Sequence, residues 1–458
     1  MMAALDTLVV ATALSRIRLD LGATVEQLEW TVNAYNLSFA VLLITTAALG
    51  DRFGRRRLFA VGLGVFSLAS GASALAPSVG WLIAARALQG VGSALIMPLG
   101  LALLTAAFPP EKRGAAIGMF SAVTGLAVAS GPFIGGAVVE GIDWHWVFWL
   151  NVPIGLAAIP LVLTRVDESF GPDTGLDLRG LGLVTGGAIG IVWGLMRGNQ
   201  VGWSSVETVA ALVVGVAVLV LFVLWEGRAR EPMLPIRLFR SRGFAAGNTA
   251  IFFTMASLFG AVFFYAQLLQ VGLGYGPLAT GVRLIPWTAT FICVAPVAGA
   301  LANRVGERTL LAAGLTLQAA GMVWLAVIAE PGLAYGRMLA PFVVAGVGVS
   351  MAIPAAQNSA VGTAEAEAIG KAAGANSMMR ELGGVFGVAV AVAVFAAGGS
   401  YASAQAFVDG FGPAMGVAAV LSVAGAVAAL ALPGRRPAGA RVTVVEPAEP
   451  EPVLEAAS

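Results

Sequence analysis

The sequence predicts an all-α protein that crosses a membrane many times, and three observations carry this prediction. Hydrophobic residues make up 58% of the 458 residues and charged residues only 11%, whereas about a quarter of a soluble globular protein is charged. The apolar residues fall into blocks of about 20, the length of helix that spans a hydrocarbon core of roughly 30 Å. Apolar and polar residues do not alternate within these blocks, as they would in the strands of a membrane barrel, so helices are expected.

The composition excludes several classes of site. The chain has one cysteine, Cys293, and one histidine, His145, so it offers no disulfide framework, no cysteine-based metal site and no multi-histidine metal centre. The net charge of +1 gives no basic excess for binding nucleic acid. The sequence also contains no Walker-type glycine-rich loop for ATP and no nucleophile–base constellation in its short loops. We therefore expect no cofactor, no metal, no ATP, no nucleic acid partner and no enzymatic activity.

Fourteen apolar blocks are expected to be membrane spans. Most of the 26 Lys and Arg residues fall in alternate connecting segments, which the positive-inside rule places in the cytoplasm. Both termini are then cytoplasmic and the protein is expected in the plasma membrane. The apolar part of the first block is only about 14 residues long, short for a span, so we expect a further cytoplasmic turn or two before it. The blocks cover residues 1–19, 29–50, 58–76, 81–108, 115–139, 146–164, 181–198, 206–225, 244–271, 278–302, 310–328, 338–361, 372–397 and 411–432.

An internal repeat divides the chain. The second block ends in Ala-Ala-Leu-Gly-Asp-Arg-Phe-Gly-Arg-Arg from Ala47, and the tenth ends in Gly-Ala-Leu-Ala-Asn-Arg-Val-Gly-Glu-Arg from Gly299. Halves repeated about an axis along the membrane normal are a transporter architecture, and six helices from each half leave two over. We expect an N-terminal six-helix lobe (1–164), two additional helices with flanking cytoplasmic segments (165–243), a C-terminal six-helix lobe (244–432) and a disordered cytoplasmic tail (433–458).

The end of the second block carries the sequence Asp-Arg-Phe-Gly-Arg-Arg from Asp51. It resembles the loop 2–3 signature of the major facilitator superfamily, in its fourteen-spanner drug:proton antiporter branch, and the resemblance extends over essentially the whole chain. It implies the major facilitator fold and a conformational gate in this loop. Gly54 would allow the tight turn, and Asp51 could meet a helix N-terminus or a basic partner and so latch one conformational state. The arginines alone would equally suit a positive-inside anchor. The gate residues are Asp51, Arg52, Gly54, Arg55 and Arg56.

The fourth block resembles a second motif of this family, with Arg86 followed by Gln89, Gly90 and Gly92. An arginine inside a membrane is expensive and usually faces a polar interior. The small glycines favour a close-packed face. The alternative is that Arg86 snorkels to the nearby outer surface.

The fifth block resembles the family's antiporter signature, with Ala127 in place of its middle glycine. Pro132 removes a helix hydrogen bond and kinks the span, while glycines let a neighbouring backbone approach closely. This motif separates exporters from importers, so the expected direction of transport rests on the resemblance. Its residues are Gly118, Gly131, Pro132, Gly135 and Gly136.

Asp6 lies in the first block, in a pattern similar to the family's first-helix motif, with Ser15 in place of the usual proline. The charged form of an acid among Leu and Val is disfavoured, so Asp6 is expected to take up and release the coupling proton. It is the only clear carboxylate that we expect within the N-terminal spans, and Arg86 is its expected electrostatic partner. The alternative is an interfacial helix cap.

Other polar residues within the spans are candidates for the lining of a central cavity. Arg380 and Glu381 favour a structural ion pair over a second proton site, and Arg283 is ambiguous. Because acids within the spans are few, we expect neutral or amphiphilic substrates more than cations. The candidate lining residues are Asn33, Tyr35, Asn36, Gln89, Gln267 and Gln270.

The expected function is alternating-access antiport in the lipid bilayer, with protons driving the export of small hydrophobic, amphiphilic or cationic compounds such as drugs, antiseptics or antibiotics. A uniporter or symporter for a metabolite is the alternative, and a protonophore would separate the two. A membrane-embedded enzyme is a further alternative, which the lack of a catalytic constellation disfavours.

Overall fold

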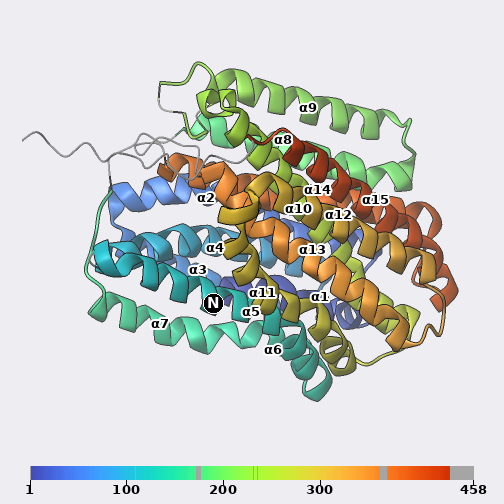
Figure 1. Ribbon diagram of the computed structural model, residues 1–458. Helices are drawn as coiled ribbons and strands as arrows, with labels where there is room; N and C mark the ends of the chain where they lie inside the picture. Colours follow the sequence, from blue (N-terminus) through green and yellow to red (C-terminus); the bar gives the residue numbers. More distant parts are fainter. Residues whose placement is uncertain are drawn as a thin grey trace, which may run out of the picture.

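A computed structural model describes residues 2–108, 110–171, 177–230, 232–234, 236–361 and 369–433. Every regular element formed by these residues is a helix, and Figure 1 shows the long helices running side by side. The first group comprises α1 (Met2–Leu21), α2 (Val25–Phe53), α3 (Arg55–Ala74), α4 (Val79–Ala107), α5 (Pro110–Gly141), α6 (Trp146–Trp149) and α7 (Asn151–Arg165). The middle of the chain forms α8 (Leu178–Val201), α9 (Val206–Glu226) and the short 3₁₀-helix η1 (Ile236–Arg240). The last group comprises α10 (Arg242–Gln267), the π-helix η2 (Leu268–Gly272), α11 (Pro277–Val305), α12 (Glu307–Ile328), α13 (Tyr335–Val361), α14 (Ile369–Gly398) and α15 (Ala404–Leu430).

Each of the fourteen expected spans contains a helix. Among the described residues, twelve helical segments are long and apolar enough to cross a membrane. The other two expected spans coincide with α1 and α5, which are 20 and 32 residues long. The expected sixth span corresponds to α6 and α7, which meet at Leu150 and together form one of the twelve segments, Trp146–Arg165. Of the expected disordered tail, residues 434–458 lie outside the described residues.

Side-chain caps fix where several helices begin. The hydroxyl of Thr24 accepts a hydrogen bond from the Gln27 amide, and the Gln27 side chain accepts one from the Thr24 amide, which is a complete capping box. Such a cap satisfies two backbone N–H groups that the first turn of a helix leaves without partners. The Ser78 hydroxyl caps α4 and the Ser205 hydroxyl caps α9, each by accepting from the backbone amide three residues later. The caps let consecutive helices follow one another through short connections.

Two glycines make the internal repeat visible in the backbone. Gly54 lies between α2 and α3 with φ 105°, and Gly306 lies between α11 and α12 with φ 93°. Both values fall in a region that L side chains avoid and glycine adopts freely. The two glycines occupy the same position in the repeated decapeptide, so the repeat encodes the same tight turn twice.

The helices pack into two groups. In the N-terminal bundle (α1–α7), α2 and α3 both pack against α4, α1 packs against α5, and α3 against α7. In the C-terminal bundle (α10–α15 with η2), α12 packs against α13 and α15, and α10 against α14 and α15. The bundles meet where α5 packs against α11, α2 against α14, and α1 against α10.

The helices α8 and α9 form a hairpin at the edge of the molecule. They pack against each other, and α8 also contacts α14 and α2. Figure 1 shows α9 on the outer side, away from both bundles. Its valine-rich surface is exposed, with Val206 86% and Val213 61% accessible, as suits a helix that faces lipid.

Candidate functional site

A buried ion pair lies at the centre of the N-terminal bundle. Asp6 of α1 and Arg86 of α4 are each 1% exposed, and the Arg86 Nη1 donates to the Asp6 Oδ2. Arg86 therefore does not snorkel outward, and Asp6 does not cap the helix at the interface. The pairing of these two residues, which the sequence predicted, is present in the structure.

Three more side chains complete the hydrogen bonding of this pair. The Gln89 Nε2 donates to the Asp6 Oδ1 over 3.0 Å, while the Gln89 Oε1 accepts from the Arg86 Nη1 over 2.7 Å. Asn151 of α7 donates to the same Asp6 oxygen over 3.3 Å. Both amides also donate to the Ser70 Oγ, over 3.2 and 3.1 Å. A buried charge is tolerated when it is paired and hydrogen bonded in this way.

The other side of Arg86 is held by α2. The Arg86 Nε donates to the backbone oxygen of Thr31 over 3.0 Å, and the guanidinium lies 4.3 Å from the centre of the Tyr35 ring. The Tyr35 hydroxyl is in turn 2.7 Å from the Ser93 Oγ. Besides Asp6, the Arg86 guanidinium therefore has partners on α2.

Sequence reasoning missed Ser70 and Asn151. Ser70 is one of three serines in the apolar block 58–76, and Asn151 is the one amide in the apolar block 146–164. A serine or an amide in a span is a weak signal on its own, because nothing in its spacing shows which neighbour it meets. The structure brings both to Asp6 from helices distant in the chain.

The loop between α2 and α3 is tied to the segment that follows α7. Asp51 pairs with Arg55 over 2.7 Å, one helical turn apart. The Arg56 amide donates to the Glu168 Oε1 over 2.8 Å, and the Arg56 Nη1 donates to the Val166 oxygen over 3.1 Å. Asp51 thus has the basic partner that the sequence suggested, but all these contacts lie within the N-terminal half, and Glu168 was not foreseen.

Further backbone contacts fix the same loop. The Gly171 amide donates to the Asp51 oxygen over 3.0 Å, and the Arg55 amide donates to the Ser169 oxygen over 3.0 Å. Arg52 is exposed, with its guanidinium 5.5 Å from the centre of the Phe53 ring. The loop between α2 and α3 is therefore held to residues 166–171 by both backbone and side-chain hydrogen bonds.

The glycines of α5 bring the two bundles into backbone contact. A Cβ atom added at Gly136 would collide with the Pro277 oxygen of α11, and one added at Gly281 of α11 would collide with the Pro132 oxygen. Gly135 faces the other way and lies against Thr12 of α1. Gly131 and Pro132 are buried in the same stretch. Gly118 lies outside the residues whose surroundings the structure describes.

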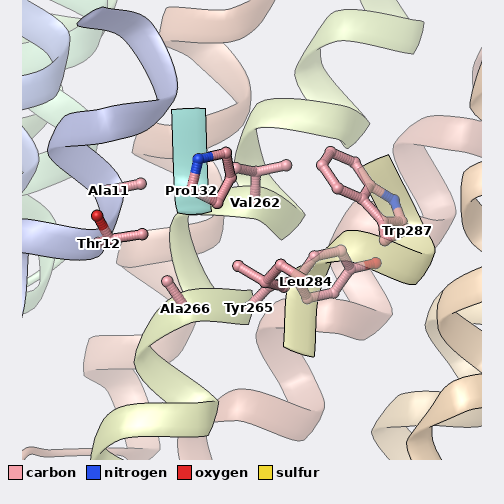
Figure 2. Close-up of a pocket in the computed structure, with 8 residues that line it drawn as sticks. All are labelled: Ala11, Thr12, Pro132, Val262, Tyr265, Ala266, Leu284 and Trp287. Atoms are coloured by element: carbon pink, nitrogen blue, oxygen red, sulfur yellow. The ribbon is translucent and has the colours of Figure 1, made fainter. Parts of the chain in front are cut away.

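A small cavity lies between the bundles at this crossing (Figure 2). Its volume is about 10 Å³, room for roughly one water molecule. Tyr265 and Trp287 form its aromatic side, with ring centres 6.0 Å apart, and the Tyr265 hydroxyl is buried without a hydrogen-bond partner. The lining residues are Ala11 and Thr12 of α1, Pro132 of α5, Val262, Tyr265 and Ala266 of α10, and Leu284 and Trp287 of α11.

None of the six candidate lining residues borders this cavity. Tyr35 and Gln89 belong to the Arg86 cluster. The Gln270 Nε2 donates to the Thr12 oxygen over 3.0 Å and so joins η2 to α1, while Gln267 accepts from the Tyr401 hydroxyl. The cavity is instead lined mainly by apolar and aromatic residues. In the sequence, such residues cannot be told apart from the other apolar residues of the spans.

Glu29 corrects the expectation that Asp6 is the only carboxylate within the N-terminal spans. It lies one turn inside α2 and is 0% exposed. The Asn33 Nδ2 donates to its Oε1 over 3.0 Å, and its Oε2 has no partner. Glu29 stands at the first position of the apolar block 29–50, where an acid is ordinarily at the membrane surface. Its spacing from Asn33 and Asn36, at i+4 and i+7, was the signal that could have found it.

Two arginines of the C-terminal bundle now have defined surroundings. Arg380 and Glu381 form the expected ion pair, with 2.8 Å between Nη2 and Oε1. Arg283 lies against two tyrosine rings, 3.8 Å from the centre of Tyr275 and 5.3 Å from that of Tyr335. The Tyr335 hydroxyl also donates to the Arg283 backbone oxygen over 2.9 Å.

The two bundles are joined at the end of the molecule where α1 and α5 end and α11 begins. The Leu278 amide, in the first turn of α11, donates to the Glu140 Oε2 of α5 over 2.8 Å. The Arg18 guanidinium of α1 lies 4.6 Å from the centre of the Tyr401 ring. These contacts lie at chain positions that the sequence assigns to the outer side. With the narrow cavity, they show that the two bundles are in contact at this end.

Comparisons with known proteins agree with this architecture. The family model described as Major Facilitator Superfamily matches residues 1–388 and 287–456. The tetracenomycin C resistance and export protein of Streptomyces glaucescens is 37% identical over 394 residues, covering 85% of this chain and 73% of that protein. The cephamycin export protein CmcT of Amycolatopsis lactamdurans is 34% identical over 438 residues, covering 93% of this chain and 89% of that one.

A solved structure shares the fold. A crystal structure of a mutant peptide transporter POT in complex with sulfate superposes with a TM-score of 0.67 at 17% identity, over 92% of this chain and 91% of that one. This likeness supports the fold alone. The family match extends over the helices that hold the buried ion pair, the repeated turn and the α5–α11 crossing. On this evidence the chain is a multi-pass membrane transporter and not an enzyme, and it belongs to the major facilitator superfamily.

Proposed function

We propose that this protein exports small hydrophobic, amphiphilic or cationic compounds from the cytoplasm in exchange for protons. The similarity to proteins named for the export of tetracenomycin C and cephamycin, and for multidrug resistance, supports the substrate class. The proton gradient is the energy source, without ATP or another cofactor. Both termini are cytoplasmic in this proposal, as the distribution of basic residues indicates.

One observation supports proton coupling above all others: the paired charges of Asp6 and Arg86, each 1% exposed, inside a bundle of membrane helices. When Asp6 is charged, it holds Arg86 and accepts from Gln89 and Asn151. A proton on its Oδ2 would remove the attraction and release Arg86 toward its remaining partners on α2, the Thr31 oxygen and the Tyr35 ring. Protonation therefore changes the bond between α1 and α4, one of the contacts that fix the shape of the bundle.

The α5–α11 crossing supplies the second element of the cycle. Because glycines bring these backbones into contact at the outer side, the bundles can rock about this line without prising side chains apart. A proton entering from outside gains about 2.3 kcal/mol per 100 mV of membrane potential. This free energy supports roughly a 50-fold substrate gradient for each proton.

The tight turns at Gly54 and Gly306 fit a gate on the cytoplasmic side. The first carries the Asp51–Arg55 pair and the contacts to residues 166–171. We expect these contacts to form in one transport state and to loosen in the other. Substitution of Asp51 by Asn would then slow transport without changing the affinity for substrate.

A susceptibility test in an efflux-deficient bacterial host examines the proposal. The wild type should raise resistance to at least one compound of a panel that includes ethidium, puromycin and a tetracyclic antibiotic. A protonophore should abolish ethidium efflux from these cells within minutes. Efflux that persists with the membrane gradient collapsed would support a uniporter and end the proposal of antiport.

A further inference from the structure

We propose that Glu29, Asn33 and Asn36 form a binding site for an organic ammonium group on the inward side of α2. The inference deepens the proposed function, because it names the substrate class that one surface of the transport path would select. It also reverses the expectation of neutral substrates, which rested on the scarcity of acids within the spans. Glu29 is 0%, Asn33 0% and Asn36 2% exposed.

The three residues share one side of α2. With about 100° between successive residues of an α-helix, Glu29, Asn33 and Asn36 lie within about 60° of one another. The α4 side of the helix is taken by other residues, since Ser38 donates to the Ala87 oxygen and Thr46 to the Ala94 oxygen. The site residues are therefore separate from the face that packs on α4.

The next side of α2 is also occupied. Leu37 and Val41 pack with Val184 of α8 and with Ala372 and Ala375 of α14. Glu29, Asn33 and Asn36 therefore lie on the side of α2 between the face that packs on α4 and the face that packs on α14. Because all three are buried, that side faces protein and not lipid.

The polar atoms on this side lack partners. The Glu29 Oε2, the Asn33 Oδ1 and the Asn36 Nδ2 are all buried without a hydrogen bond, and only the bond from the Asn33 Nδ2 to the Glu29 Oε1, 3.0 Å long, joins the group. A buried polar atom without a partner costs about 1–3 kcal/mol, and more when it is charged. Three such atoms on one side of a helix indicate a missing ligand.

The chemistry of the free atoms selects the ligand. Two of them, the Glu29 Oε2 and the Asn33 Oδ1, are acceptors one helical turn apart, and Glu29 carries a charge when ionised. In the described part of the chain no Lys, Arg or His forms an ion pair with Glu29. A group with two or more N–H donors and a positive charge satisfies both acceptors, which an alcohol or an apolar group does not. The free Asn36 Nδ2 would donate to a hydroxyl or carbonyl oxygen on the same ligand.

This site is distinct from the proton site. Asp6 already accepts from Arg86, Gln89 and Asn151 and is paired with a cation. Glu29 accepts from one amide and is paired with none of the described cations. Asp6 is therefore already neutralised by a cation, whereas Glu29 is available to pair with the cation of a ligand.

The test uses three probes of one shape in nanodiscs that contain the full chain: 1-aminoadamantane, its N,N,N-trimethyl derivative and 1-adamantanol. Binding is measured by titration calorimetry with empty nanodiscs as the blank. The wild type should bind the primary amine at least tenfold more tightly than the alcohol, with the trimethyl cation between them because it has charge but no N–H donor. Equal binding of amine and alcohol would overturn the inference.

Two substitutions and a control locate the effect. Glu29→Gln should abolish the preference for the amine, while Asn33→Leu should reduce it about threefold because the carboxylate is kept. Glu26→Gln removes a carboxylate one turn earlier on the same helix, at a half-buried position, and should leave the preference intact. A preference that survives Glu29→Gln, or that Glu26→Gln removes equally, would contradict the assignment. The Asn33→Leu result decides if the glutamine variant does not fold.

The inference and the proposed function can fail separately. Loss of the amine preference, with protonophore-sensitive export still present, would end this inference alone. An amine preference without any proton-driven transport would instead end the proposed antiport and leave a cation-binding site.

Discussion

The two bundles bury different kinds of side chain. In the N-terminal bundle three ionisable residues are almost fully buried: Asp6, Glu29 and Arg86 are each 0–1% exposed. In the C-terminal bundle the Arg380–Glu381 pair is less deeply buried, with Glu381 7% exposed. The fully buried contacts there include neutral ones, such as the bond from the Gln318 Nε2 to the Ser257 Oγ, 3.2 Å long. The C-terminal bundle also holds a chain of packed aromatic rings, in which Phe264 packs against Phe395, Phe395 against Phe407, and Phe407 against Phe411.

This difference indicates a division of labour between structurally repeated halves. A buried charge changes its interactions when it gains or loses a proton, whereas packed rings and neutral hydrogen bonds do not. The N-terminal bundle is therefore suited to respond to the proton gradient. The C-terminal bundle contributes Tyr265 and Trp287 to the inter-bundle cavity, and under the proposed function we expect this aromatic surface to face the substrate.

The largest effect is expected from breaking the ion pair on one side. Arg86→Met should destabilise the protein by about 3–5 kcal/mol, because it leaves Asp6 charged and unpaired. The double variant Asp6→Asn/Arg86→Met should recover a large part of this loss. Thermal unfolding in one detergent, with all four proteins compared, measures the coupling. Additive losses would show that the two charges do not depend on each other.

The crossing of the bundles should tolerate no added volume. Gly281→Ala places a Cβ against the Pro132 oxygen and should cost about 1–3 kcal/mol, as overpacking does. Gly416→Ala is the matched control, because nothing lies within 4 Å of a Cβ at that position of α15. The same unfolding assay compares the two, and equal melting temperatures would contradict the close contact of α5 and α11.

A neutral bond of the C-terminal bundle should matter for stability and not for coupling. Gln318→Leu removes the bond to Ser257 and should lower the unfolding free energy by about 1 kcal/mol. The ratio of protons to substrate moved in liposomes should stay as in the wild type. A changed ratio of protons to substrate would mean that the C-terminal bundle takes part in proton coupling. That result would contradict the assignment of proton coupling to the N-terminal bundle.

The smallest effect is expected at the outer contact between the bundles. Glu140→Gln keeps an oxygen that can accept from the Leu278 amide and removes the charge near the start of α11. The loss should be about 0.3–1 kcal/mol for an exposed carboxylate at a helix N-terminus. Glu140→Ala, which removes the acceptor too, should be worse and should loosen the contact between α5 and α11 at this end. Accessibility of a cysteine introduced on α11 to a membrane-impermeant reagent measures that loosening.

The sequence could predict what depends on local pattern. Apolar blocks predicted helices at the right places, and the repeated Gly54 and Gly306 predicted equivalent turns, because glycine alone suits that backbone conformation. The pairing of Asp6 with Arg86 was predicted because both charges stand inside apolar blocks, where each needs a partner.

Contacts between helices that are far apart in the chain could not be predicted from local pattern. Ser70 and Asn151 reach Asp6 from α3 and α7, and the cavity around Tyr265 and Trp287 takes residues from four helices. No spacing within one helix encodes such contacts. Glu29 was missed for a different reason, since an acid at the end of an apolar block is ordinarily at the membrane surface.

The measurement that tests the central claim most directly compares wild type and Asp6→Asn in liposomes with an imposed pH gradient. The wild type should accumulate ethidium against its gradient when the pH difference is present. Asp6→Asn should still exchange labelled for unlabelled ethidium at equilibrium but should accumulate none. If the variant accumulates ethidium as the wild type does, the buried pair in the N-terminal bundle is not where the proton acts.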